Sequence, residues 1–138
     1  MGVPGYLKND LYGEDEVTGR VFLVGGKCAC GHLCFPYQNF GCERCGALHV
    51  ERVRLPAEGV LRASARVHRH RGEREAPFVV GSIVLDAGPL VRTLLACSSE
   101  DLPPRPGVRV AGCFREAKDA ANETVRDLRF RVVSGGGQ

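Results

Sequence analysis

Apolar and polar residues alternate along much of the second half of the chain. In residues 59–69 the odd positions Leu61, Ala63, Ala65 and Val67 are apolar, and the even positions between them are polar. A strand with one face buried and one face in water has this period of two. The pattern therefore predicts a half-buried strand. The polar face is expected to carry Arg62, Ser64, Arg66, His68 and His70.

Four further segments have strand character, at residues 77–85, 90–97, 108–114 and 124–133. The first is an almost continuous apolar run, as in a strand buried on both faces, and the turn Asp86-Ala87-Gly88-Pro89 follows it. A small open sheet would leave its edges exposed, so five strands are expected to close or partly close into a barrel. An OB-fold fits this number of strands best. An SH3-like barrel would give the same pattern and stays open as an alternative.

Residues 1–20 have no clear period. Leu7, Leu11 and Tyr12 are spaced as on one side of a short helix, which makes a helix the candidate element there. Hydrophobic residues make up 43% of the 138 positions and charged residues 25%, the balance of a soluble globular protein. No apolar run approaches the roughly 20 residues of a membrane helix. The N-terminus lacks the basic start and apolar stretch of a secretory signal, so the cytoplasm is the expected location.

The cysteines provide the strongest chemical signal. Five of the seven fall in the short stretch between positions 28 and 45, and four of these form two close pairs, Cys28 with Cys30 and Cys42 with Cys45. Paired thiolates at this spacing are typical of a closed, tetrahedral, structural zinc site. The second pair has the usual C-x-x-C-G form, whereas the first is C-x-C, one residue shorter than usual. We expect one structural zinc per chain, held by these four sulfurs.

Other interpretations of this cluster remain open. Cys34, in an apolar setting, is interpreted as a core residue, with replacement of Cys28 as a ligand the alternative. An iron tetrathiolate would make the protein an electron carrier, although such sites normally have two C-x-x-C pairs. His32 and His49 are interpreted as surface residues. With the cysteine module placed, the expected organisation is a leader at 1–20, a zinc ribbon at 21–53, an OB-fold domain at 54–133 and a flexible tail at 134–138.

The predicted polar strand face is basic. Arg62, Arg66, His68 and His70 share it, and arginine binds phosphate in a bidentate manner. The face is therefore a candidate contact for coenzyme A or for an acidic partner surface, with simple solvation as the alternative. No catalytic residue is expected, because Cys97 and Cys113 lie on predicted strands, where a packing role is the usual one.

The sequence resembles a family of proteins that join a rubredoxin-like zinc ribbon to an OB-fold and work with acyl-CoA-metabolising enzymes. The matching segments are Gly26-Lys27-Cys28-Ala29-Cys30-Gly31, Gly41-Cys42-Glu43-Arg44-Cys45-Gly46, Pro77-Phe78-Val79-Val80 and Leu85-Asp86-Ala87-Gly88-Pro89. The resemblance covers about residues 20–133. It implies a non-catalytic accessory subunit that binds a larger thiolase-like partner in a complex acting on CoA thioesters.

A zinc ribbon with an OB-fold could instead bind single-stranded nucleic acid, using stacked aromatic residues over a basic groove. The chain has no Trp, only 7% aromatic residues and a net charge of +3. The predicted strand phenylalanines Phe78, Phe114 and Phe130 are expected in the core. Composition therefore argues against a nucleic-acid partner.

Overall fold

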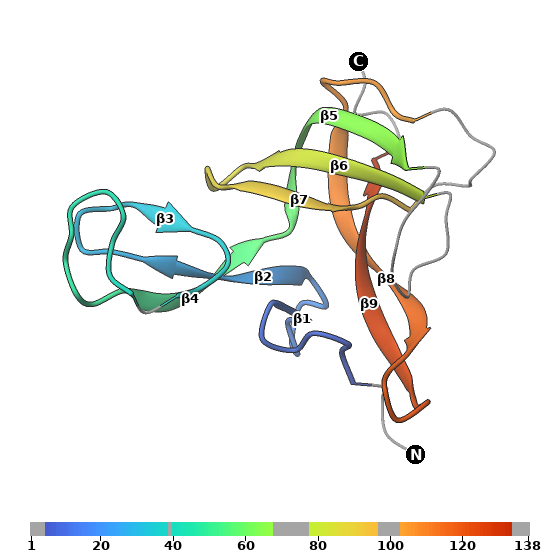
Figure 1. Ribbon diagram of the computed structural model, residues 1–138, viewed down its shortest axis with the longest axis horizontal. Helices are drawn as coiled ribbons and strands as arrows, with labels where there is room; N and C mark the ends of the chain where they lie inside the picture. The colour runs from blue at the N-terminus through green and yellow to red at the C-terminus, as the bar shows by residue number, and fades with distance from the viewer. Residues whose placement is uncertain (1–4, 39, 68–77, 97–102, 134–138) are drawn as a thin grey trace.

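The computed structural model describes residues 5–38, 40–67, 78–96 and 103–133, and these residues form two sheets and no helix (Figure 1). Among them, no helix has the length and apolar character needed to cross a membrane. The strands are β1 Tyr12–Glu14, β2 Val21–Lys27, β3 Leu33–Cys34, β4 Glu51–Pro56, β5 Glu58–Val67, β6 Phe78–Leu85, β7 Leu90–Leu94, β8 Arg109–Lys118 and β9 Thr124–Val132.

The first sheet is built around β2. One edge of β2 pairs with β1 and then with β3, and the other edge pairs antiparallel with β4 over six residue pairs. The loops at the outer end of this sheet carry the cysteines. In Figure 1 the sheet extends to one side of the molecule, away from the larger barrel.

The second sheet has the order β7-β6-β5-β8-β9 and curls into a partly closed barrel (Figure 1). Its two edge strands meet through a parallel bridge between Leu95 and Phe130, and the Ala96 amide donates to the Phe130 carbonyl at 2.7 Å. This strand order, in which the third and fifth strands of the barrel (β7 and β9) meet in parallel, is that of an OB-fold. The expected mostly β fold, a four-cysteine ribbon followed by a five-stranded OB-type barrel, is therefore confirmed.

A single hydrophobic core joins the two sheets. Leu23 and Leu55 of the first sheet pack in the same cluster as Leu61, Ile83 and Phe130 of the barrel, all at most 3% exposed. Only Ala57, itself 1% exposed, separates β4 from β5. The ribbon therefore passes into the barrel without a flexible linker.

The alternation predicted along β5 is wrong beyond Leu61. Leu61 pairs with Ile83 but Ala63 pairs with Ser82, so Arg62 is an extra residue in a β-bulge. A bulge of one residue exchanges the two faces of the strand beyond it. Ala63 and Ala65 are consequently exposed, and Arg66, paired with the buried Val79, turns towards the inner side. Arg62 and Arg66 do not share a face.

The helix expected within residues 1–20 is also absent from the described part of that segment. Residues 7–11 form turns and β1 follows, with Tyr12 paired to Leu23. The segment is held by long-range contacts instead, since Tyr6 bridges to Arg126 and the Leu7 amide donates to the Arg126 carbonyl at 2.8 Å. The apolar spacing that suggested a helix reflects burial of Leu11 and Tyr12 against the barrel.

Candidate metal centre

Two tight turns carry the four clustered cysteines. Cys28 and Cys30 follow directly after β2, and the Gly31 amide closes the first turn on the Cys28 carbonyl at 2.9 Å. In the second turn the Gly46 amide donates to the Cys42 carbonyl at 2.8 Å. Gly31 and Gly46 have φ values of 94° and 78°, a region that residues with a Cβ rarely adopt. Glycine after each cysteine pair therefore allows the chain to turn back.

The four sulfurs converge on one point. The Sγ atoms of Cys28, Cys30, Cys42 and Cys45 all lie within 4.8 Å of one another. Cys28 Sγ is 3.4 Å from Cys45 Sγ, and Cys30 Sγ is 3.8 Å from Cys42 Sγ. Zinc–sulfur bonds of about 2.3 Å in a tetrahedron place neighbouring sulfurs about 3.8 Å apart. The spacing of this donor set fits a tetrahedral metal ion.

Backbone amides favour negative charge on the second pair. The Arg44 and Cys45 amides donate to Cys42 Sγ at 3.4 and 3.5 Å. These hydrogen bonds, that of Cys45 first, lower the pKa of the Cys42 thiol to about 6. At Cys28 the Cys30 amide acts in the same direction, but the adjacent Cys45 sulfur and burial outweigh it and raise the pKa to about 12. Four sulfurs this close do not all ionise unless a cation compensates their charge.

One side of the cluster is sealed by the protein. Cys28 and Cys42 are buried beside Val50, with Cys34 and Tyr37 packed against them, whereas Cys30 and Cys45 face outwards. Four thiolates would complete a tetrahedral shell, which leaves no open position for a substrate. A zinc ion held here would stabilise structure, because it has no redox chemistry and no free coordination position.

The neighbouring candidates have other roles in the structure. Cys34 lies on β3, outside the four-sulfur group, and packs beneath it. His32 Nε2 lies 2.8 Å from Glu43 Oε1 and so links the two turns on their outer side. His49 is exposed.

The structure separates the predicted basic group. Arg62 is exposed at the bulge, whereas Nε and Nη2 of Arg66 are buried and have no hydrogen-bond partner among the described residues. His68, His70 and Cys97 lie outside the described residues. Cys113 is half-buried; burial raises the pKa of its thiol, and the nearby Arg131 and Arg129 only partly oppose this. A thiol in this state is a poor nucleophile.

One polar group of the structure has no clear signal in the sequence. The Tyr12 hydroxyl donates to Asp127 Oδ1 at 2.7 Å, and Arg129 Nη1 donates to the other oxygen of the carboxylate. Asp127 is 9% exposed, the one buried charged residue of the described part. Burial alone would raise the pKa of Asp127, but hydrogen bonds from Arg129 and Tyr12 hold it below its usual value. The one sequence signal for this buried group is that Asp127 is an acidic residue within an otherwise apolar and basic strand.

Comparison with known proteins shows the fold. No family model matches the sequence, and no curated protein matches it. Among solved structures, the chain is similar to one described as "Ltp2-ChsH2(DUF35) aldolase", with a TM-score of 0.61 and 24% sequence identity. The match covers 80% of this chain and 84% of the other. The two chains thus share a fold.

Proposed function

We propose that Cys28, Cys30, Cys42 and Cys45 bind one structural zinc ion in a rubredoxin-like ribbon. The convergence of four thiols is the observation that carries this proposal. Zinc is favoured over iron because the first pair is C-x-C and not the C-x-x-C usual in iron tetrathiolates. Elemental analysis of the purified protein tests the choice. The colour of the protein is a second test, because a zinc tetrathiolate is colourless whereas an iron tetrathiolate is red.

We further propose that the protein is a non-catalytic accessory subunit of a thiolase-type acyl-CoA enzyme complex. The fold shared with a chain of an aldolase supports this assignment, together with a metal site that has no open position. Among the described residues, no histidine is hydrogen-bonded to a cysteine or serine that it could activate as a nucleophile. The chemistry is accordingly assigned to a larger partner, and this chain to assembly and support.

Within that class, the short motifs around the cysteines favour the small subunit of benzoylsuccinyl-CoA thiolase, which acts in a β-oxidation-like step of anaerobic toluene degradation. The supporting segments are the C-x-C start, Phe35-Pro36-Tyr37-Gln38 and Gly41-Cys42-Glu43-Arg44-Cys45-Gly46. Affinity purification of the tagged chain from its native cells tests the assignment. We expect a thiolase-like chain to co-purify and only the pair to cleave CoA thioesters. Thiolysis by the isolated chain would refute the accessory role.

Contact with the CoA part of the substrate is proposed at Arg62, whose exposed guanidinium is available to a phosphate. Arg66 turns inward and is a weaker candidate, and His68 and His70 lie outside the described residues. The test is Arg62→Ala in the complex, with Arg115→Ala on β8 as the matched control. An increase in KM for the acyl-CoA with Arg62→Ala alone would support the contact, and equal behaviour of both variants would exclude it.

A further inference from the structure

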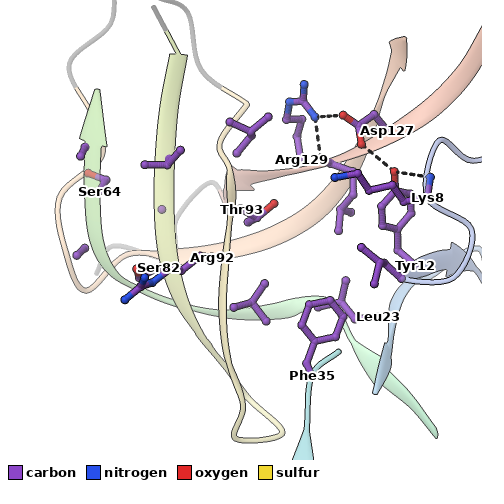
Figure 2. Close-up of a pocket in the computed structure, with 18 residues that line it drawn as sticks. Lys8, Tyr12, Leu23, Phe35, Ser64, Ser82, Arg92, Thr93, Asp127 and Arg129 are labelled. Atoms are coloured by element: carbon purple, nitrogen blue, oxygen red, sulfur yellow. Dashed lines mark hydrogen bonds and ion pairs between the residues drawn. The ribbon is translucent and has the colours of Figure 1, made fainter. Parts of the chain in front are cut away.

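The barrel contains a cavity of about 510 Å³ beside its seam. The seam closes where Leu95 meets Phe130, and the cavity lies next to this point, between residues 91–94 of β7 and 127–129 of β9. The N-terminal segment contributes Lys8, Leu11 and Tyr12 to its wall, β2 contributes Leu23, and Phe35 reaches it from the loop after β3 (Figure 2). Three parts of the chain that are distant in sequence therefore line one space.

The wall of the cavity is mainly apolar, with Leu11, Leu23, Phe35, Val91 and Leu128 among its side chains. Ligand-binding pockets have volumes of about 300–1,000 Å³ and combine such walls with a few convergent polar groups. This cavity is within that range. The apolar wall is suited to a hydrocarbon chain or ring system.

One end of the cavity carries a linked polar group, whereas Ser64, Ser82, Arg92 and Thr93 line other parts of the wall. Figure 2 shows Tyr12, Asp127 and Arg129 linked by hydrogen bonds there, with Lys8 next to them. Tyr12 is already engaged, because its hydroxyl donates to Asp127 and accepts the Lys8 amide at 3.2 Å. Arg129 uses only Nη1, which donates to Asp127 and to the Leu128 carbonyl at 3.0 Å. Nε and Nη2 of Arg129 have no partner among the described residues.

The charge at this end is not balanced. Arg129 compensates Asp127, but within the described residues the Lys8 ammonium has no carboxylate at ion-pair distance. Burial and the Asp127 charge also raise the pKa of Tyr12, burial first, so the phenol stays neutral at ordinary pH. An anionic group here would meet the Lys8 ammonium and the unused donors of Arg129, the pairing that charge-assisted hydrogen bonds favour.

We propose that this cavity binds an amphiphilic carboxylate, with its hydrocarbon part against the apolar wall and its carboxylate between Lys8 and Arg129. The ligand class follows from the combination of an apolar space with a cationic end. This is a property of the chain itself and does not depend on the proposed partner, so the two can fail separately.

Calorimetric titration of the zinc-loaded full-length chain with decanoate tests the proposal, with decanol as the uncharged probe of equal chain length. We expect decanoate to bind and decanol to bind about fivefold more weakly, the value of one solvent-accessible ion pair. No binding of decanoate, or equal binding of both probes, would overturn the proposal.

Two pairs of variants locate the site. Thr93→Phe fills the cavity from β7 and should weaken decanoate binding by about tenfold or more, as expected for steric exclusion. The same change at Thr124, outside the cavity wall, should have no effect. Lys8→Gln alters an exposed residue and should weaken decanoate but not decanol, whereas Lys118→Gln at the end of β8 should change neither. Unchanged decanoate binding in folded Lys8→Gln would contradict the proposed carboxylate position, even if Thr93→Phe failed to fold.

Discussion

Tyr12 and Asp127 form a buried hydrogen bond of 2.7 Å between the N-terminal segment and the last strand. The bond spans 115 positions of the sequence and lies where the first sheet meets the barrel. It satisfies the one buried carboxylate of the described residues and holds β1 against β9. The polar pair thus fixes an interface that is otherwise formed by apolar contacts.

Removing the Tyr12 hydroxyl should destabilise the protein. In Tyr12→Phe, Asp127 loses a hydrogen-bond donor while remaining buried, and the expected loss in unfolding free energy is about 1–3 kcal/mol. Urea denaturation followed by circular dichroism measures it. Tyr37→Phe is the matched control, since the Tyr37 hydroxyl has no hydrogen bond within the described residues and its removal should cost under about 0.5 kcal/mol. Equal stability of the two variants would contradict the structural role of the Tyr12 hydroxyl.

Stability should depend on pH through Asp127. The folded pKa of Asp127 lies below its unfolded value of about 3.9, so its contribution is complete above that value and is lost as the pH falls through the folded pKa. Unfolding free energies measured between pH 6 and pH 2 should therefore fall less steeply in Asp127→Asn than in the unaltered protein. An identical pH profile in the two proteins would show that the carboxylate is not stabilised in the fold.

Loss of one cluster thiol should release the metal. Cys42→Ser and Cys45→Ser each remove one of four converging ligands, and we expect near-complete loss of bound zinc, measured by elemental analysis after gel filtration. Because metal binding and folding of small zinc modules are linked, the ribbon should also lose its order, measured by amide hydrogen exchange of residues 21–53. Cys34→Ser is the control and should retain zinc. Retention by all three variants would disprove this ligand set.

A methyl group at Gly59 should disrupt the barrel. A Cβ at this position of β5 would lie 2.2 Å from the Val84 carbonyl oxygen and 2.8 Å from Leu85 Cα, both backbone atoms that cannot rotate away. We expect Gly59→Ala to cost about 3 kcal/mol or more, in the upper range of overpacking effects. Gly5→Ala, where a Cβ would meet nothing within 4 Å, provides the comparison in thermal unfolding. A wild-type melting temperature for Gly59→Ala would contradict this close strand approach.

Local sequence patterns located the regular strands well. Residues 124–133 were expected as a strand and β9 is Thr124–Val132, while residues 77–85 correspond to β6 Phe78–Leu85. In both segments, apolar residues recur along the whole strand and several of them are buried, so local pattern and backbone conformation agree. The cysteine spacing likewise indicated which four thiols converge.

Features that depend on pairing between distant segments were not accessible from the sequence. The bulge at Arg62 leaves the local alternation unchanged and becomes visible only in the register of β5 against β6. The N-terminal segment is turn and strand because its partners lie on β2 and β9, which local propensity does not report. The Asp127 carboxylate is buried for the same reason, since Tyr12 reaches it from the opposite end of the chain.

The single buried residue between β4 and β5 has a mechanical consequence. Ala57 is anchored on both sides, its amide donating to the Val21 carbonyl at 3.2 Å and its carbonyl accepting the Gly112 amide at 2.7 Å. Because Ala57 is held on both sides, the end of the first sheet that carries the cysteines has a fixed orientation relative to the barrel. A partner that binds the cysteine-bearing end therefore also determines how the barrel is oriented in the complex.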